Sequence, residues 1–167
     1  MLFSRSPIVL AGRALLAAGV LLTVSSCASG GAGSGSGDPT QIDFAPELGI
    51  FLSQMTLTPD GLYYHDLAVG TGAEARLNKR VRIHYNGWHP DGRLFDSSLA
   101  REEPFEFVLG HREVIRGWEL GVRGMRVGGR RLLVIPPKLA YGSRGLSGAI
   151  EGNATLVFEV QLLDVKN

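Results

Sequence analysis

The stretch RVRIHYNGW, residues 80–88, alternates between basic or polar and apolar side chains. Val81, Ile83 and Tyr85 share one face of an extended chain, which is the period-two pattern of a half-buried β-strand. The next four residues, HPDG at 89–92, place a proline early and a glycine late, as turns do. Residues 94–97 are therefore predicted to return as a second, antiparallel strand.

The same pattern extends in both directions from this hairpin. Strands are predicted at residues 62–69, 105–109, 130–135 and 155–165, and a glycine-rich loop at 138–152. A short helix begins near Glu113, because Ile115, Trp118 and Val122 fall at i, i+3 and i+7. The sum is about five or six antiparallel strands and one helix that must cover one face of the sheet. This predicts an α+β domain of roughly 105 residues, from residue 62 to residue 167. The residues assigned to its core are Phe107, Leu109, Leu133 and Leu156.

The N-terminus reads as an export signal. Arg5 and Arg13 come before an apolar run at residues 14–22. Small residues then lead to Cys27. The run is too short for a comfortable membrane span. The stretch VSSC, residues 24–27, resembles a bacterial lipobox, which implies removal of residues 1–26 and lipidation of Cys27. A plain signal peptide and an uncleaved signal anchor are the alternatives.

Two segments separate Cys27 from the domain. Residues 29–37 contain only Ser, Gly and Ala, so residues 27–37 are interpreted as a flexible tether. Residues 38–61 carry apolar side chains, but Pro46 and Gly49 argue against a long helix. We expect an N-terminal arm, partly ordered by packing across the domain. The expected location is extracytoplasmic, anchored by lipid to a bacterial membrane.

Composition excludes several classes of protein. The net charge is +1, and losing Arg5 and Arg13 makes it 15 − 16 = −1, so no general attraction to nucleic acid is expected. A single cysteine excludes an intramolecular disulfide. The GTGAEA stretch at residues 70–75 lacks the following helix of a dinucleotide site. The four histidines have no metal-ligand spacing and are interpreted as scattered surface residues. Neither a metal nor a cofactor is predicted, and a monomer is the default.

Several segments together resemble the FKBP family of macrolide-binding prolyl isomerases, from about residue 62 to residue 165. Any one of them alone is a weak signal, but their order and spacing make the resemblance specific. It implies a five- or six-stranded antiparallel half-barrel wrapped on one short helix. The matching segments are VRIHYNG (81–87), DGRLFDSS (91–98), PFEFVLG (104–110), EVIRGWELGV (113–122), AYG (140–142) and ATLVF (154–158).

Carried over position by position, the resemblance implies an aromatic pocket. Trp118 would be the floor under the proline ring, the Tyr141 hydroxyl and the Ile115 N–H would hold substrate carbonyls, and Arg101 would pair with Asp96. The implied catalytic residues are Tyr85, Phe95, Asp96, Trp118 and Tyr141. The implied substrate contacts are Phe105, Val114, Ile115, Ile150 and Phe158.

The function implied is isomerisation of X-Pro bonds in exported polypeptides, by non-covalent catalysis that needs no nucleophile. Macrolide inhibitors are the other ligands that the family implies. The alternative is a chaperone or partner-binding module with little isomerase activity, because a fold does not fix a function. The sequence departs from the family at residues 146–152, LSGAIEG, where prolines are common. A more mobile loop is expected there.

Overall fold

Strand β3, Arg80–Trp88, has the bounds that its alternation predicted. Val81, Ile83 and Tyr85 on it are at most 6% exposed. One edge of β3 pairs with β7, Leu156–Lys166. The other edge pairs with β5, Phe105–Val108, near the start of β3 and with β4, Leu94–Ser97, near its end. Because β4 and β5 follow one another along the same edge, the segment between them lies beside Tyr85.

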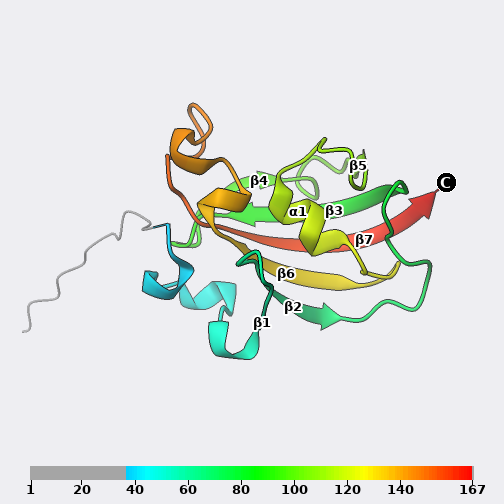
Figure 1. The fold of residues 1–167 in the computed structure, drawn as a ribbon, viewed down its shortest axis with the longest axis horizontal. Helices are drawn as coiled ribbons and strands as arrows, with labels where there is room; N and C mark the ends of the chain where they lie inside the picture. The colour runs from blue at the N-terminus through cyan, green and yellow to red at the C-terminus, as the bar shows by residue number, and fades with distance from the viewer. Residues whose placement is uncertain (1–36, 167) are drawn as a thin grey trace, which may run out of the picture. The chain divides into compact units, whose positions relative to one another are not determined.

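The computed structural model describes residues 37–166, which build a seven-stranded antiparallel sheet (Figure 1). Its main path runs β1-β2-β6-β7-β3-β4, with β2 at Tyr63–Ala68 and β6 at Arg130–Ile135. The α+β class and all six predicted strands are confirmed. The additional strand β1, Thr56–Leu57, comes from the arm and was missed because two residues show no alternation. The predicted signal peptide, Cys27 and residues 28–36 lie outside the described part.

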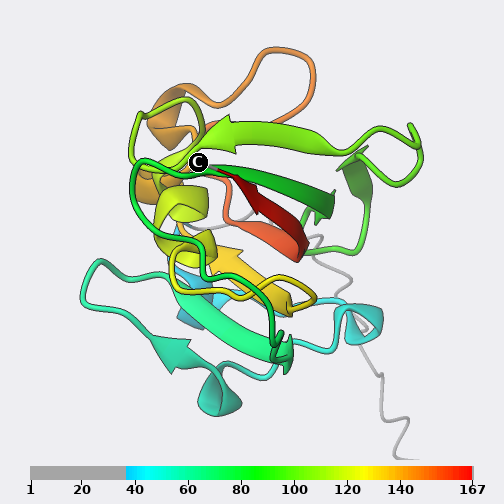
Figure 2. The same ribbon diagram turned by 90° about the vertical axis from the view of Figure 1, so that its right-hand side faces the viewer.

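The single α-helix of this part, α1, spans Arg116–Val122 and lies against β6 on the inner side of the curved sheet (Figure 2). It starts three residues later than predicted, because Ile115 has extended backbone angles. Two helix glycines allow the close approach. A Cβ at Gly117 would lie 2.7 Å from Ile135 Cδ1, and one at Gly121 would lie 2.7 Å from Leu133 Cδ1.

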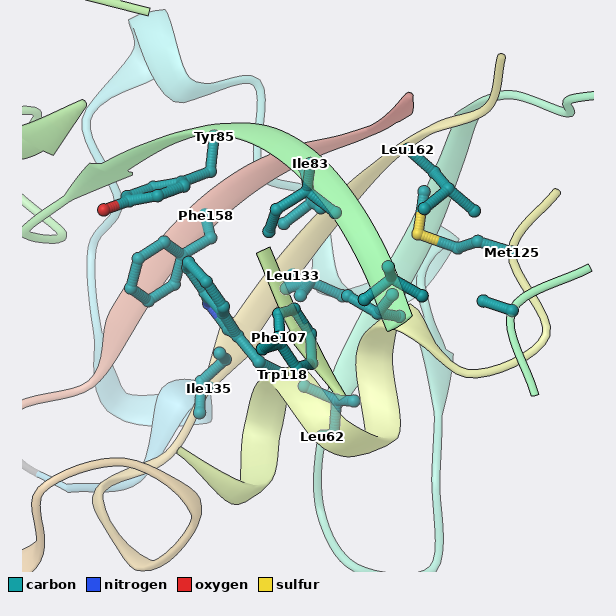
Figure 3. Close-up of a cluster of buried hydrophobic side chains, with 14 of the residues drawn as sticks. Leu62, Ile83, Tyr85, Phe107, Trp118, Met125, Leu133, Ile135, Phe158 and Leu162 are labelled. Atoms are coloured by element: carbon teal, nitrogen blue, oxygen red, sulfur yellow. The ribbon is translucent and has the colours of Figure 1, made fainter. Parts of the chain in front are cut away.

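The main core fills the space between α1 and the sheet (Figure 3). Phe107, Leu109, Leu133 and Leu156 are fully buried in it, as predicted. Trp118 projects from α1 into the same cluster, where it meets Tyr85 and Phe158 from the sheet. The core therefore continues without interruption into the aromatic residues expected to bind substrate.

The opposite face of the sheet has a second, smaller cluster. Leu132, Val134 and Val157 are at most 7% exposed there. Half-buried side chains from the arm cover them, among them Phe44 and Leu48. The arm is built from three short 3-10 helices: η1 (Pro39–Gln41), η2 (Pro46–Leu48) and η3 (Leu52–Gln54). It closes the outer face of the sheet while α1 closes the inner face.

The loop between β6 and β7 carries two further 3-10 helices, η4 (Pro137–Leu139) and η5 (Gly142–Arg144). Within residues 37–166, no helix has the length and apolar character to cross a bilayer. The interpretation of all four histidines as surface residues is wrong for His89. This side chain is 9% exposed because it packs against Phe95, with 5.1 Å between ring centroids.

Candidate active site

A cavity of about 280 Å³ opens between the start of α1, the β3–β5 edge and the β6–β7 loop. Nine of the ten catalytic and substrate-contact residues predicted from the sequence line it, and Glu113 is a lining residue that was not predicted. The lining residues are Tyr85, Phe95, Asp96, Phe105, Glu113, Val114, Ile115, Trp118, Tyr141 and Phe158. Since they come from four strands, one helix and two loops, only the fold brings them together.

Trp118 is the centre of the aromatic wall. Its ring centroid lies 4.7 Å from that of Tyr85 and 5.2 Å from that of Phe158 (Figure 3). The centroid of Phe105 lies 5.9 Å away, and all three pairs are edge-to-face. Edge-to-face rings are favourable and fix one another's orientation. Trp118 is 6% exposed, whereas Phe105 is 38% exposed. The cavity thus has a deep, rigid indole floor and a more accessible rim.

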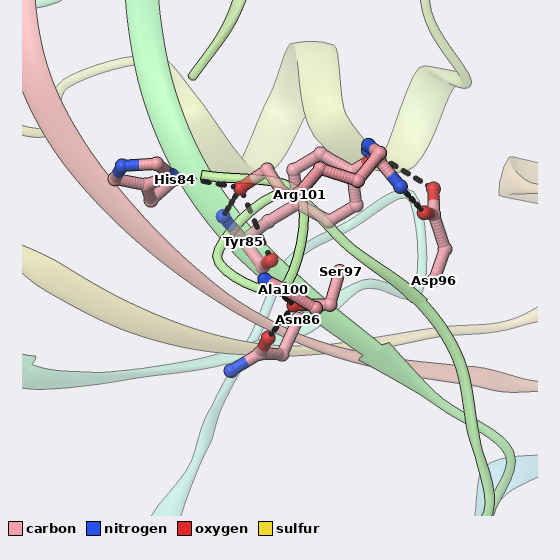
Figure 4. Close-up of polar contacts among 8 residues, drawn as sticks. His84, Tyr85, Asn86, Asp96, Ser97, Ala100 and Arg101 are labelled. Carbon is pink, nitrogen blue, oxygen red and sulfur yellow. Dashed lines mark hydrogen bonds and ion pairs between the residues drawn. The ribbon is translucent and has the colours of Figure 1, made fainter. Parts of the chain in front are cut away.

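One polar group lies beside this wall. The Tyr85 hydroxyl donates a 2.5 Å hydrogen bond to Asp96 Oδ2 and accepts one of 2.9 Å from Arg101 (Figure 4). The same guanidinium forms an ion pair with Asp96 Oδ1. Arg101 does not line the cavity. Its part is to hold the carboxylate and the phenol that do.

Two serines help to position Tyr85 and Arg101 next to each other. Ser98 fills the gap in the β3 ladder between β4 and β5, since it donates its N–H to the Tyr85 carbonyl and accepts the Tyr85 N–H on Oγ at 2.8 Å. Ser97 Oγ donates to Asn86 and accepts the Ala100 N–H at 3.0 Å. Together they fix the start of the segment that carries Arg101.

Several lining residues carry donors without a partner among residues 37–166, including the buried indole N–H of Trp118. Within residues 37–166, neither the Tyr141 hydroxyl nor the Ile115 backbone N–H makes a hydrogen bond. Ile115 immediately precedes α1, where the first N–H groups of a helix have no intrahelical acceptor. Free donors at the mouth of an apolar cavity are suited to bind carbonyl oxygens of a peptide.

The comparisons with known proteins agree with this geometry. A family model described as FKBP-type peptidyl-prolyl cis-trans isomerase matches residues 72–163. The chain belongs to the FKBP family. The FK506-binding protein of Neisseria meningitidis serogroup B is 48% identical over 105 residues, which are 63% of this chain and 96% of that protein.

Other relatives are longer than the shared FKBP domain. FK506-binding protein 4 of Dictyostelium discoideum is 49% identical over 66% of this chain, but only 30% of that protein is covered. The crystal structure of FkpA from Escherichia coli matches with a TM-score of 0.63 and 42% identity, over 68% of this chain and 52% of that one. The matches thus cover about two thirds of this chain and about half or less of these two relatives.

The charge state of the FKBP site follows from its hydrogen bonds. Partial burial alone would raise the pKa of Asp96, but the bonds from Tyr85 and Arg101 outweigh it and hold that pKa below its ordinary value. Burial, and then the bond to Asp96, raises the pKa of Tyr85. Burial, and then the charge of Asp96, raises the pKa of Tyr141. At neutral pH Asp96 is therefore ionised, and the phenols of Tyr85 and Tyr141 are neutral.

Two residues of this FKBP domain differ in place from the expectation. Glu113 was missed as a lining residue; its carboxylate accepts the Val108 N–H at 3.0 Å, which ties the entry to α1 back onto β5. Ile150 does not line the cavity. It is 6% exposed, in a tight turn closed by two hydrogen bonds with Leu146, and its role as a substrate contact stays a prediction. Among residues 37–166 no cluster of acidic, histidine or cysteine side chains could hold a metal.

Proposed function

We propose that this protein catalyses cis-trans isomerisation of X-Pro bonds in exported polypeptides, within the cavity above Trp118. The observation that carries the proposal is the cavity itself: an aromatic site in which the Tyr141 hydroxyl, the Ile115 N–H and the Trp118 indole N–H have no hydrogen-bond partner among residues 37–166. Membership of the FKBP family supports the same reaction.

The reaction needs little from an enzyme. An X-Pro bond isomerises unaided in tens to hundreds of seconds over a barrier of about 18–20 kcal/mol. Reaching an ordinary turnover of about 1–10³ per second requires that the barrier fall by roughly 3–7 kcal/mol. No bond to carbon or oxygen breaks, so a nucleophile has nothing to do.

The cavity lowers the barrier through polarity and position. The twisted transition state has lost amide resonance, so its carbonyl oxygen carries less charge than in the planar ground state. An apolar site therefore binds the twisted form better than the planar one. Trp118 holds the proline ring, while Tyr141 and Ile115 hold carbonyls on one side so that the other side rotates.

Asp96 acts in this mechanism as an anion with a fixed position. Its carboxylate is held from both sides, by the Tyr85 hydroxyl and the Arg101 guanidinium, and its pKa lies below the ordinary value. A general base is most effective with a pKa near the working pH. Asp96 is therefore an orienting and electrostatic residue, which places a fixed negative charge beside the X-Pro imide.

The setting of the reaction is part of the proposal. The signal-like residues 1–26, Cys27 at their end and the Ser/Gly/Ala stretch after it support a lipid-anchored protein outside the cytoplasm, tethered close to emerging substrates. The relatives named FK506-binding proteins support binding of macrolides in the same cavity. A monomer acting alone is sufficient for this chemistry.

The test is isomerisation of Leu-Pro and Ala-Pro tetrapeptides by the full chain, with and without a macrolide. Fast conversion that the macrolide inhibits supports the enzyme and the cavity together. Fast conversion without inhibition supports the isomerase function and attributes the weak macrolide binding to the altered residues 146–152. A folded protein that accelerates neither peptide would overturn the proposal in favour of a binding module.

A further inference from the structure

A second cavity, of about 400 Å³, lies next to the first, and Val114 lines both. Leu77, Val114 and Leu120 give it an apolar base, and arginine side chains surround it. Its size is in the range of ligand-binding pockets. It lies where a polypeptide leaving the proline cavity over Val114 would continue.

The rim of this second cavity carries positive charge. The guanidinium groups of Arg112 and Arg123 make no hydrogen bond or ion pair with any of residues 37–166. Arg116 is the third cation, paired with Asp60 at 3.0 Å. Glu119 is the one anion in the lining, and its carboxylate is occupied by backbone N–H groups of Gly110 and Arg112. Two free cations therefore face an apolar base.

The loop that carries Arg112 is held in one conformation before any substrate binds. Arg112 has a positive φ of 60°, an unusual conformation for a residue with a side chain. The bond of 3.0 Å from its N–H to Glu119 on α1 stabilises this conformation. A guanidinium on a preorganised backbone loses less freedom when it binds a carboxylate.

We propose that the second cavity is a specificity subsite for the polypeptide substrate, which takes an acidic residue close to the proline in sequence, because Val114 lines both cavities. The substrate class is thus polypeptides with a Glu or Asp near an X-Pro bond. A carboxylate would pair with Arg112 and Arg123, and its methylene groups would lie on Leu77 and Leu120. This inference rests on the proposed isomerase function.

The experiment uses the full chain and nine-residue peptides with one central Leu-Pro bond, followed by exchange NMR without a coupling protease. Glu, Gln or Lys is placed in turn at each of the three positions before and after the Leu-Pro pair. At one or two positions on one side, we expect kcat/KM for Glu to exceed that for Lys by about threefold to tenfold, the range for a pair of exposed ion pairs. High salt should reduce the ratio.

The matched variants reverse the charge. Arg112→Glu with Arg123→Glu should prefer Lys over Glu at the same position and leave tetrapeptide turnover unchanged. Arg93→Ala, which removes an exposed arginine that lines neither cavity, should keep the preference for Glu.

The outcomes separate this inference from the function on which it rests. Absence of turnover even on the tetrapeptide would refute the isomerase itself. Normal tetrapeptide turnover with equal rates for Glu, Gln and Lys everywhere would refute only the subsite. The subsite is also refuted if the charge-reversed variant loses binding to vesicles containing anionic lipid while its peptide preferences match the wild type, because the cations would then serve a membrane surface.

Discussion

Replacing Gly117 by alanine tests whether close packing of α1 on β6 positions the cavity floor. The new Cβ would lie 2.7 Å from Ile135 Cδ1, about 1 Å short of the 3.5–4.0 Å at which carbon atoms pack. Overpacking of this kind costs about 1–3 kcal/mol. The change from glycine to alanine inside a helix returns up to about 1 kcal/mol. The steric effect is the larger one, so the free energy of unfolding should fall by about 1–2 kcal/mol.

Activity should fall with stability, because the next residue on the helix is Trp118. A displacement of about 1 Å at the floor is expected to lower kcat/KM by tenfold to a hundredfold. Urea unfolding followed by circular dichroism measures the first effect, and exchange NMR on an Ala-Leu-Pro-Phe peptide measures the second.

A second substitution in Ile135 makes the test specific. Ile135→Ala alone should lower the free energy of unfolding by about 2–5 kcal/mol. The Gly117→Ala, Ile135→Ala double variant should lose about 1–3 kcal/mol less than the sum of the two single losses, because the new methyl group fills part of the vacated space. Additive effects, or a fully active and more stable Gly117→Ala protein, would refute the packing argument.

Three further predictions concern the site and the arm. Tyr85→Phe should cost about 1 kcal/mol of stability in urea unfolding, because it removes the hydroxyl that bonds Asp96; an unchanged midpoint would mean that the bond contributes nothing. The pKa of Asp96 is lowered from 3.8, so its contribution to stability is present above pH 3.8 and is lost as the pH falls through its folded pKa; the pKa of Tyr85 is raised from 10.0, so its contribution is present below pH 10.0 and is lost as the pH rises through its folded pKa. Activity should thus be flat from about pH 5 to pH 9, and a step within that range would contradict these assignments. Phe44→Ala, at a half-buried side chain that packs against the cluster of Leu132, Val134 and Val157, should cost about 1–2 kcal/mol without changing tetrapeptide turnover. Phe51→Ala, at a side chain 63% exposed in the same arm, should cost less than about 0.5 kcal/mol; equal costs would argue against the arm as a cover.

The sheet could be predicted because its strands have one buried face. In β3, Val81 and Ile83 are fully buried while Arg80 is exposed, so the period of two is visible in the sequence. The position of each aromatic residue in the cavity was not visible in that pattern. It came from the resemblance to a family, since core and pocket aromatics alternate in the same way along a strand.

The start of α1 was misplaced for a local reason. Glu113 and Glu119 look like ordinary helix residues, yet their carboxylates accept backbone N–H groups from the preceding segment. Glu113 accepts from Val108 at the end of β5, and Glu119 accepts from Arg112 in the loop that follows. These bonds tie residues 113–115 to the segment before them, and Ile115 has non-helical backbone angles, φ −58° and ψ 146°. The bond from the Val108 N–H also holds Glu113 at the edge of the cavity, a position that no periodic sequence pattern could indicate.

The arm was only partly predictable. Its 3-10 helices are three residues each, too short for a helical repeat. One signal of its role was available: residues 132–135, LLVI, are apolar on both faces of β6, and a strand buried on both sides needs a second cover. Leu132 and Val134 face the arm, and Leu133 and Ile135 face α1.

The most direct test of the aromatic cavity as an isomerase site is the turnover of a Phe95→Ala, Asp96→Ala double variant. Both side chains line the cavity beside Trp118, and neither is part of the fully buried core. In a protein whose circular dichroism matches the wild type, kcat/KM on a Leu-Pro tetrapeptide should fall by about tenfold or more. Full activity in that folded variant would contradict the assignment of the reaction to this cavity.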